Sequence, residues 1–132
     1  MTPYLLVIDD NLEWADLIKT VAERAQYRAA VAPNAGEGLR MIANDAPDII
    51  ALDIFMPDMD GIEVIWELGK LPHKPDLLLI SGNAAPMLHA AKSLAEENGL
   101  TVLGAFAKPV RLTELRTVLE KSLVDRQAPP TP

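Results

Sequence analysis

The amino-acid sequence predicts a doubly wound α/β fold, in which helices cover both faces of a five-stranded parallel sheet. Short runs of apolar residues alternate along the chain with segments in which apolar residues recur every three or four positions. The runs contain no regular polar alternation, as expected for parallel strands that are covered on both faces. This strand–helix unit repeats five times, and right-handed crossovers then produce the predicted architecture.

The five expected strands are short. Clear apolar runs occupy Tyr4–Ile8, 49–52 and 77–80, a less regular run occupies 101–106, and Arg28–Ala32 is a weaker candidate. Doubly wound sheets in chains of this length commonly have the strand order 2-1-3-4-5, which is the flavodoxin-like arrangement. We therefore expect that order here.

The five expected helices each carry an apolar stripe, which a helix needs in order to pack on a sheet. The stripes consist of Trp14, Leu17, Ile18, Val21 and Ala25; Leu39 and Ile42; Ile62, Ile65, Trp66 and Leu68; Leu88, Ala91, Leu94 and Ala95; and Leu112, Leu115, Val118, Leu119 and Leu123. Asn34 followed by Glu37 is a capping box that opens the second helix, and Gly99 is the expected C-cap of the fourth.

Length and composition indicate one compact domain. We place the domain at residues 1–124, because residues 125–132 contain three prolines without apolar periodicity and suit a tail or the start of a linker. The net charge of −7 argues against a nucleic-acid surface, which needs clustered Lys and Arg. Without cysteines or a long apolar stretch, the chain is expected to be cytoplasmic, with no disulfide and no membrane segment.

Polar residues follow four of the five expected strands. Asp9 and Asp10 come after the first strand, Asp53 after the third, Ser81 after the fourth and Lys108 after the fifth. The carboxyl ends of parallel strands meet at one edge of the sheet, where doubly wound folds bind ligands. Each residue alone suits an ordinary turn, cap or surface charge. Their convergence on one edge predicts a functional site.

The chemistry of such a site follows from its charges. Three clustered carboxylates repel each other by roughly 4 kcal/mol per pair at about 4 Å, and a hard divalent cation such as Mg²⁺ relieves the repulsion. A carboxylate such as that of Asp53 can accept a phosphoryl group as an aspartyl phosphate. Lys108 and Ser81 can then contact oxygens of the transferred group, whose negative charge needs neutralising.

Four segments resemble the motifs of the response regulator receiver family, and the resemblance covers about residues 4–123. The segments are VIDD at 7–10, LDIFMPDMDG at 52–61, LLISG at 78–82 and KP at 108–109. The resemblance implies that Asp9 and Asp10 help to hold Mg²⁺, with the backbone carbonyl of Phe55 completing the metal site. It also implies that Asp53 is the phospho-acceptor.

By the same resemblance, Ser81 and Lys108 sense the phosphoryl group, and the bond between Lys108 and Pro109 is cis. The family implies a phosphorylation-activated switch, rather than a turnover enzyme, that takes its phosphoryl group from a sensor histidine kinase or a phosphotransfer protein. We also expect the domain to self-associate as a homodimer. After residue 132 we expect an effector domain, of the cyclic-di-GMP phosphodiesterase type.

One departure from the family pattern concerns an aromatic residue. Many receivers carry Tyr or Phe three residues before the lysine, where this chain has Ala105, and its aromatic residue is Phe106. Side chains alternate along a strand, so Phe106 is expected to face away from Ala105 unless a bulge intervenes.

Three other functions could use acidic residues or a fold of this kind. A phosphatase of the haloacid dehalogenase type needs a second Asp two residues after its nucleophile, where this chain has Phe55. A flavodoxin-like FMN carrier is disfavoured because the segment Asp9–Asp10–Asn11 has the wrong charge for a phosphate unless a metal intervenes. The alternative that stays open is a pseudo-receiver that is not phosphorylated and acts as a scaffold for other proteins.

Overall fold

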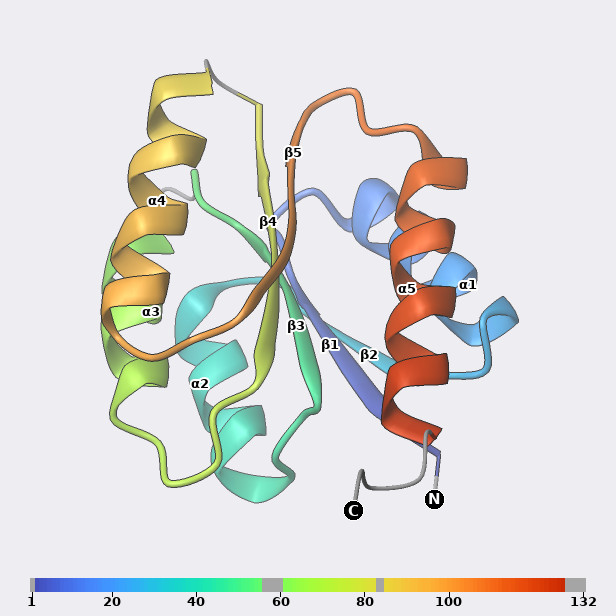
Figure 1. The fold of residues 1–132 in the computed structure, drawn as a ribbon, viewed down its shortest axis with the longest axis horizontal. Coiled ribbons are helices and arrows are strands. Elements are labelled where there is room, and N and C mark those ends of the chain that lie inside the picture. The colour runs from blue at the N-terminus through green and yellow to red at the C-terminus, as the bar shows by residue number, and fades with distance from the viewer. Residues whose placement is uncertain (1, 56–60, 83–84, 128–132) are drawn as a thin grey trace.

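The computed structural model describes residues 2–55, 61–82 and 85–127, and it has the predicted doubly wound fold (Figure 1). The elements are β1 (Tyr4–Ile8), α1 (Leu12–Arg24), β2 (Arg28–Ala32), α2 (Ala35–Asn44), β3 (Ile49–Asp53), α3 (Gly61–Gly69), β4 (Asp76–Ser81), α4 (Ala85–Glu97), β5 (Val102–Ala107) and α5 (Leu112–Gln127). The sheet is parallel, with the order β2-β1-β3-β4-β5, which confirms the prediction.

Two apolar clusters lie on the two faces of the sheet. Helices α2, α3 and α4 cover one face, and α1 and α5 cover the other (Figure 1). Alternate residues of each central strand point into opposite clusters, as the twofold period of a strand requires. Every residue of β1 and β3 is buried, which explains why these strands read as unbroken apolar runs.

The strands at the two edges of the sheet are more exposed. In β5 the register against β4 shifts by one residue, because Leu77 pairs with Val102 and Leu78 pairs with Gly104. Leu103 is therefore the extra residue of a bulge. From Gly104 onward the alternation of side chains is regular.

Local signals in the sequence fix two helix ends. The side chain of Asn34 accepts a hydrogen bond from the Glu37 backbone N–H at 2.8 Å, so the predicted cap of α2 is confirmed. Gly99 follows α4 with a φ of +81°, a conformation that favours glycine at a helix end, as predicted.

The last helix continues through the boundary that we placed after residue 124 and ends at Gln127. Residues 128–132 of the expected tail lie outside the described residues, as do residues 56–60 of the longest motif. Within the described part of the chain, no helix combines the length and the apolar character needed to cross a membrane.

Candidate phosphoryl and metal site

The structure brings the predicted site residues to the carboxyl edge of the sheet. Asp9 and Asp10 directly follow β1, Asp53 is the last residue of β3, and Lys108 directly follows β5. Ser81 is the last residue of β4, one position beyond the residue that pairs with Asp53. This placement follows from the parallel topology alone, because every strand ends at the same edge.

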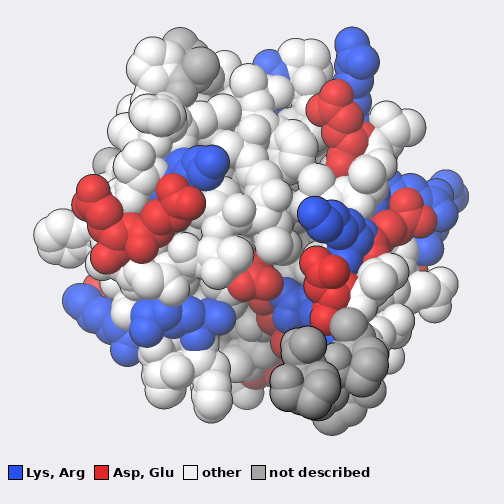
Figure 2. Space-filling model, viewed as in Figure 1, with Lys and Arg blue, Asp and Glu red and all other residues white. Residues whose placement is uncertain are grey.

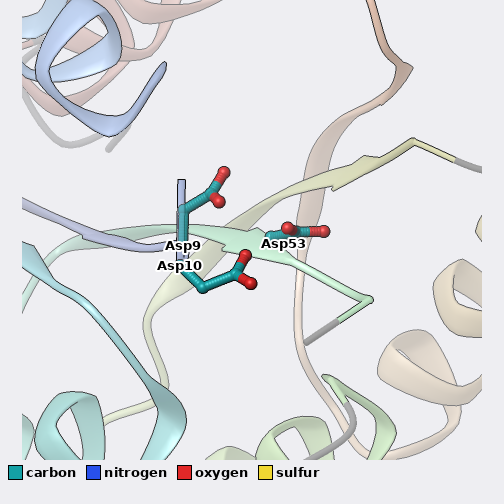
Figure 3. Close-up of side chains that lie close together, drawn as sticks. All are labelled: Asp9, Asp10 and Asp53. Atoms are coloured by element: carbon teal, nitrogen blue, oxygen red, sulfur yellow. The ribbon is translucent and has the colours of Figure 1, made fainter. Parts of the chain in front are cut away.

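Three carboxylates form the centre of the site (Figure 3). Asp9, Asp10 and Asp53 each offer one oxygen, and these oxygens all lie within 4.8 Å of one another. Asp9 is 1% exposed and Asp53 3% exposed, whereas Asp10 lies at the surface. The arrangement therefore has two buried acids and one solvent-facing acid, a set of hard oxygen donors that leaves room for water.

Backbone N–H groups hold one oxygen of each buried acid. Asp9 Oδ1 accepts a hydrogen bond from Asn11 N at 2.9 Å, and Asp53 Oδ1 accepts one from Phe55 N at 3.0 Å. The two Oδ2 atoms face the ammonium of Lys108, at 3.6 Å for Asp9 and 3.5 Å for Asp53. The ammonium group of Lys108 therefore lies between the two carboxylates.

The charge on Asp9 is poorly compensated. The pKa of its carboxyl is raised to about 6, chiefly by burial and also by the nearby charge of Asp53, while the hydrogen bond from Asn11 and the charge of Lys108 oppose the rise. Its Oδ2 atom is buried without a hydrogen-bond partner among the described residues. An orphaned carboxylate oxygen beside two further carboxylates fits a divalent cation, so the residues present suit Mg²⁺.

A hollow of about 380 Å³ opens over these groups. Its lining includes Asp10, Asn11, Asp53, Phe55, Gly82 and Lys108. Phe55, whose carbonyl the resemblance assigns to the metal, is 54% exposed at its rim. Ser81 is fully buried at the adjoining strand end.

A second hollow of about 320 Å³ adjoins the first, and Asn11, Trp14, Lys108 and Pro109 contribute to its lining. Sequence reasoning missed Asn11 and assigned Trp14 to packing alone. Its position directly after Asp10, just beyond the end of β1, could have identified Asn11 as a site residue. Asn11 also caps α1 by accepting a hydrogen bond from Trp14 N at 3.1 Å. The bond between Lys108 and Pro109 is cis, as the resemblance implied.

Comparison with known proteins decides the family. The family described as response regulator receiver domain matches residues 5–120 of the chain. The chain belongs to this family. Receiver domains of response regulators are the receiving modules of two-component signalling, and the chain has their fold as well as their sequence pattern.

Similar curated proteins differ in length. The probable C4-dicarboxylate response regulator DctR of Bacillus subtilis is 32% identical over 120 residues, which cover 89% of this chain and 50% of DctR. Sporulation initiation phosphotransferase F of the same bacterium is 26% identical over 124 residues, which cover 93% of this chain and 95% of that protein. The chain thus spans half of one relative and nearly all of the other.

Solved structures agree with the fold. A response regulator from Colwellia psychrerythraea is 35% identical, with a TM-score of 0.78 over 96% of this chain and 100% of that chain. A CheY-like receiver domain protein from Methanospirillum hungatei JF-1 is 25% identical, with a TM-score of 0.81 over 96% of this chain and 98% of that one.

Proposed function

We propose that the chain accepts a phosphoryl group on Asp53, in a Mg²⁺-dependent reaction, from a sensor histidine kinase or a phosphotransfer protein. The observation that carries this proposal is the meeting of three carboxylates and one ammonium group at one edge of the sheet. Acids packed this closely disfavour a purely structural role, because their repulsion destabilises the fold unless a cation is bound.

The proposed roles follow from position. Asp9, Asp10, Asp53 and the Phe55 carbonyl hold Mg²⁺, which when bound neutralises charge on the incoming phosphoryl group. An oxygen of Asp53 bonds to phosphorus as the bond from phosphorus to the donor's nitrogen breaks. Lys108 pairs with one phosphoryl oxygen and Ser81 donates its hydroxyl hydrogen to another, so both follow the new charge.

Such a domain acts as a switch rather than a turnover enzyme, because its phosphorylated form is the signal. The effector domain after residue 132, self-association and a cytoplasmic location stay predictions. The different lengths of the two Bacillus subtilis relatives are compatible with either a free-standing domain or a fused one. The scaffold alternative is less favoured, because a scaffold does not need the clustered acids, the hydroxyl group and the lysine.

The decisive experiment is labelling with acetyl phosphate and Mg²⁺, followed by intact-mass measurement. We expect an adduct of roughly 80 Da, one phosphoryl group, on the unmodified sequence and none on Asp53→Asn. Asp16→Asn, a change of an exposed acid in α1, is the matched control and should label normally. Persistence of the adduct in Asp53→Asn would place the acceptor elsewhere, and its absence in all variants would favour the scaffold.

A further inference from the structure

The one aromatic ring on β5 lies on the α1–α5 side of the sheet. Phe106 pairs with Ile80, which is buried in the α1–α5 cluster, and Phe106 packs against that same cluster. This confirms that it faces away from Ala105. On the α4 side of the strand, Ala105 and Ala107 are exposed. Movement of this strand end therefore displaces a ring on one side and only methyl groups on the other.

A glycine shapes the position of the ring. A Cβ atom added to Gly104 would lie 2.8 Å from both Cε2 and Cζ of Phe106. Real Cβ atoms do not approach so closely, so the ring occupies the space that the missing side chain leaves free. The ring is only partly buried, which leaves it room to respond when the strand shifts.

The turn that carries Lys108 is anchored in the α1–α5 cluster at both ends. Phe106 packs there two residues before Lys108, and Val110, two residues after it, is 7% exposed within the same cluster. Helix α5 begins directly beyond this turn (Figure 1). Lys108 N also donates a hydrogen bond to Ser81 O at 2.8 Å, so the turn is tied to β4.

We infer that Phe106 transmits the response from Lys108 to helices α1 and α5. The inference rests on the proposed phosphorylation of Asp53. A phosphoryl group there carries about 1.5 to 2 negative charges and replaces the single charge of the carboxylate, so the negative charge next to the Lys108 ammonium increases. The Lys108 side chain moves toward the added charge, and the turn that carries it moves together with Phe106 and Val110. The Phe106 ring then shifts over Gly104 and changes how α1 and α5 pack on the sheet.

The outer surface near β5 also supports transmission toward α1 and α5 rather than toward α4. Along the centre of the view in Figure 2, around the β5 edge, uncharged atoms form a strip, with charged side chains of both signs to either side. The exposed alanines of β5 carry no group that could report a shift there. The apolar anchors of the Lys108 turn, by contrast, are built into the opposite face.

The test uses beryllofluoride, a phosphoryl mimic, with Mg²⁺. Fluorine NMR measures whether it binds, and amide hydrogen exchange measures the response of each helix. We expect wild-type protection to change in α1 and α5. Phe106→Leu should still bind beryllofluoride but lose that change. Ala105→Ser, on the other side of the strand, is the matched control and should respond like the wild type.

Gly104→Ala gives a second, independent readout, because its methyl group pushes the ring aside. We expect the half-saturating beryllofluoride concentration to change by at least about threefold, and this effect to vanish in the Phe106→Leu background. An α1–α5 response that survives Phe106→Leu, or a response confined to α4, would overturn the inference alone. Failure of the wild type to bind beryllofluoride would instead overturn the proposed function.

Discussion

At the scale of single residues, Asp9 has the least favourable environment in the site. Its carboxyl is buried, so the pKa is raised from 3.8 to about 6. The folded state therefore binds a proton more readily than the unfolded state does. The stabilising contribution of this proton is present below pH 3.8 and is lost as the pH rises through about 6. At neutral pH without a divalent cation, the charged Asp9 destabilises the fold.

Asp9→Asn should therefore raise the stability of the metal-free protein at pH 7. We expect a gain of about 1–2 kcal/mol, because the amide of Asn places no charge in this buried position. Urea unfolding between pH 4 and pH 7.5 measures it, and the fall in stability between pH 4 and pH 6.5 should be shallower in Asp9→Asn. Asp16→Asn serves as the control. Parallel curves for the Asp9 variant and the wild type would show that Asp9 carries no such strain.

We predict that Phe55 governs a second property at this scale, the lifetime of the phosphoryl group proposed for Asp53. Its side chain is 54% exposed and contributes to the hollow over Asp53, where a bulky apolar group hinders water and cannot orient it. Phe55→Asn should speed the loss of phosphate by roughly fivefold, because an amide can hold the attacking water. Radiolabel decay measures the rate. Trp66→Asn, which changes a comparably exposed aromatic on α3, should decay like the wild type. Equal rates in all three proteins would exclude shielding by Phe55.

At the scale of elements, the strands were predictable and the inward faces of the helices were less so. In a parallel sheet with helices on both faces, an unbroken apolar run indicates a buried strand. In α1, however, the buried residues are Ala15, Ile18 and Ala22, while Leu17 from the predicted stripe is 47% exposed. Small residues allow the helix to approach the sheet closely, and a search for large apolar residues does not register them. Trp66 was also predicted to pack and is 57% exposed, because α3 turns Val64, Ile65 and Leu68 toward the sheet instead.

The position of the site at the sheet edge could also be predicted, because it depends only on strand order. The finer geometry could not. Which oxygen of Asp9 lacks a partner depends on the hydrogen bond from Asn11, and the second hollow depends on how Trp14 lies beside Pro109. The second hollow depends on side-chain packing between α1 and the turn after β5, which no local sequence pattern encodes.

The end of α5 is held in place by contacts with residues of other elements. Arg126 Nη2 lies 2.7 Å from Asp76 Oδ2 and donates to Asp48 O at 3.2 Å, so the last turn of α5 is tied to the starts of β3 and β4. These contacts pair residues far apart in the sequence, and for that reason a boundary at residue 124 looked natural from the sequence.

Arg126→Gln should lower the free energy of unfolding by about 1 kcal/mol, since it removes a partly buried ion pair and a hydrogen bond to a backbone carbonyl. Arg116→Gln is the matched control, because its pair with Glu120, at 3.6 Å, is exposed on the helix surface and should contribute much less. Chemical denaturation measures both. A double-mutant cycle with Asp76→Asn should recover most of the Arg126 effect as coupling, and additive effects would contradict the tie.

At the scale of the whole molecule, the net charge of −7 has both a local and a general part. Three of the acids meet at one point, and on the face shown in Figure 2 other acidic side chains lie among lysines and arginines. A divalent cation therefore has two ways to stabilise the protein, by binding in the site or by general screening. These two effects respond differently to the identity of the salt.

Mg²⁺ should raise the melting temperature by binding in the site. At about ten times its dissociation constant, mass action gives roughly 1.4 kcal/mol, or about 4 °C for a domain of this size. Thermal melts at pH 7 in Mg²⁺ and in NaCl of equal ionic strength separate binding from screening, and only Mg²⁺ should produce the full rise. The variant Asp10→Ala combined with Asp53→Ala removes two of the donors and should lose this rise, although it is itself more stable without metal because the repulsion is relieved. An equal rise in that variant, or an equal rise with NaCl, would mean that the acidic cluster does not hold the cation.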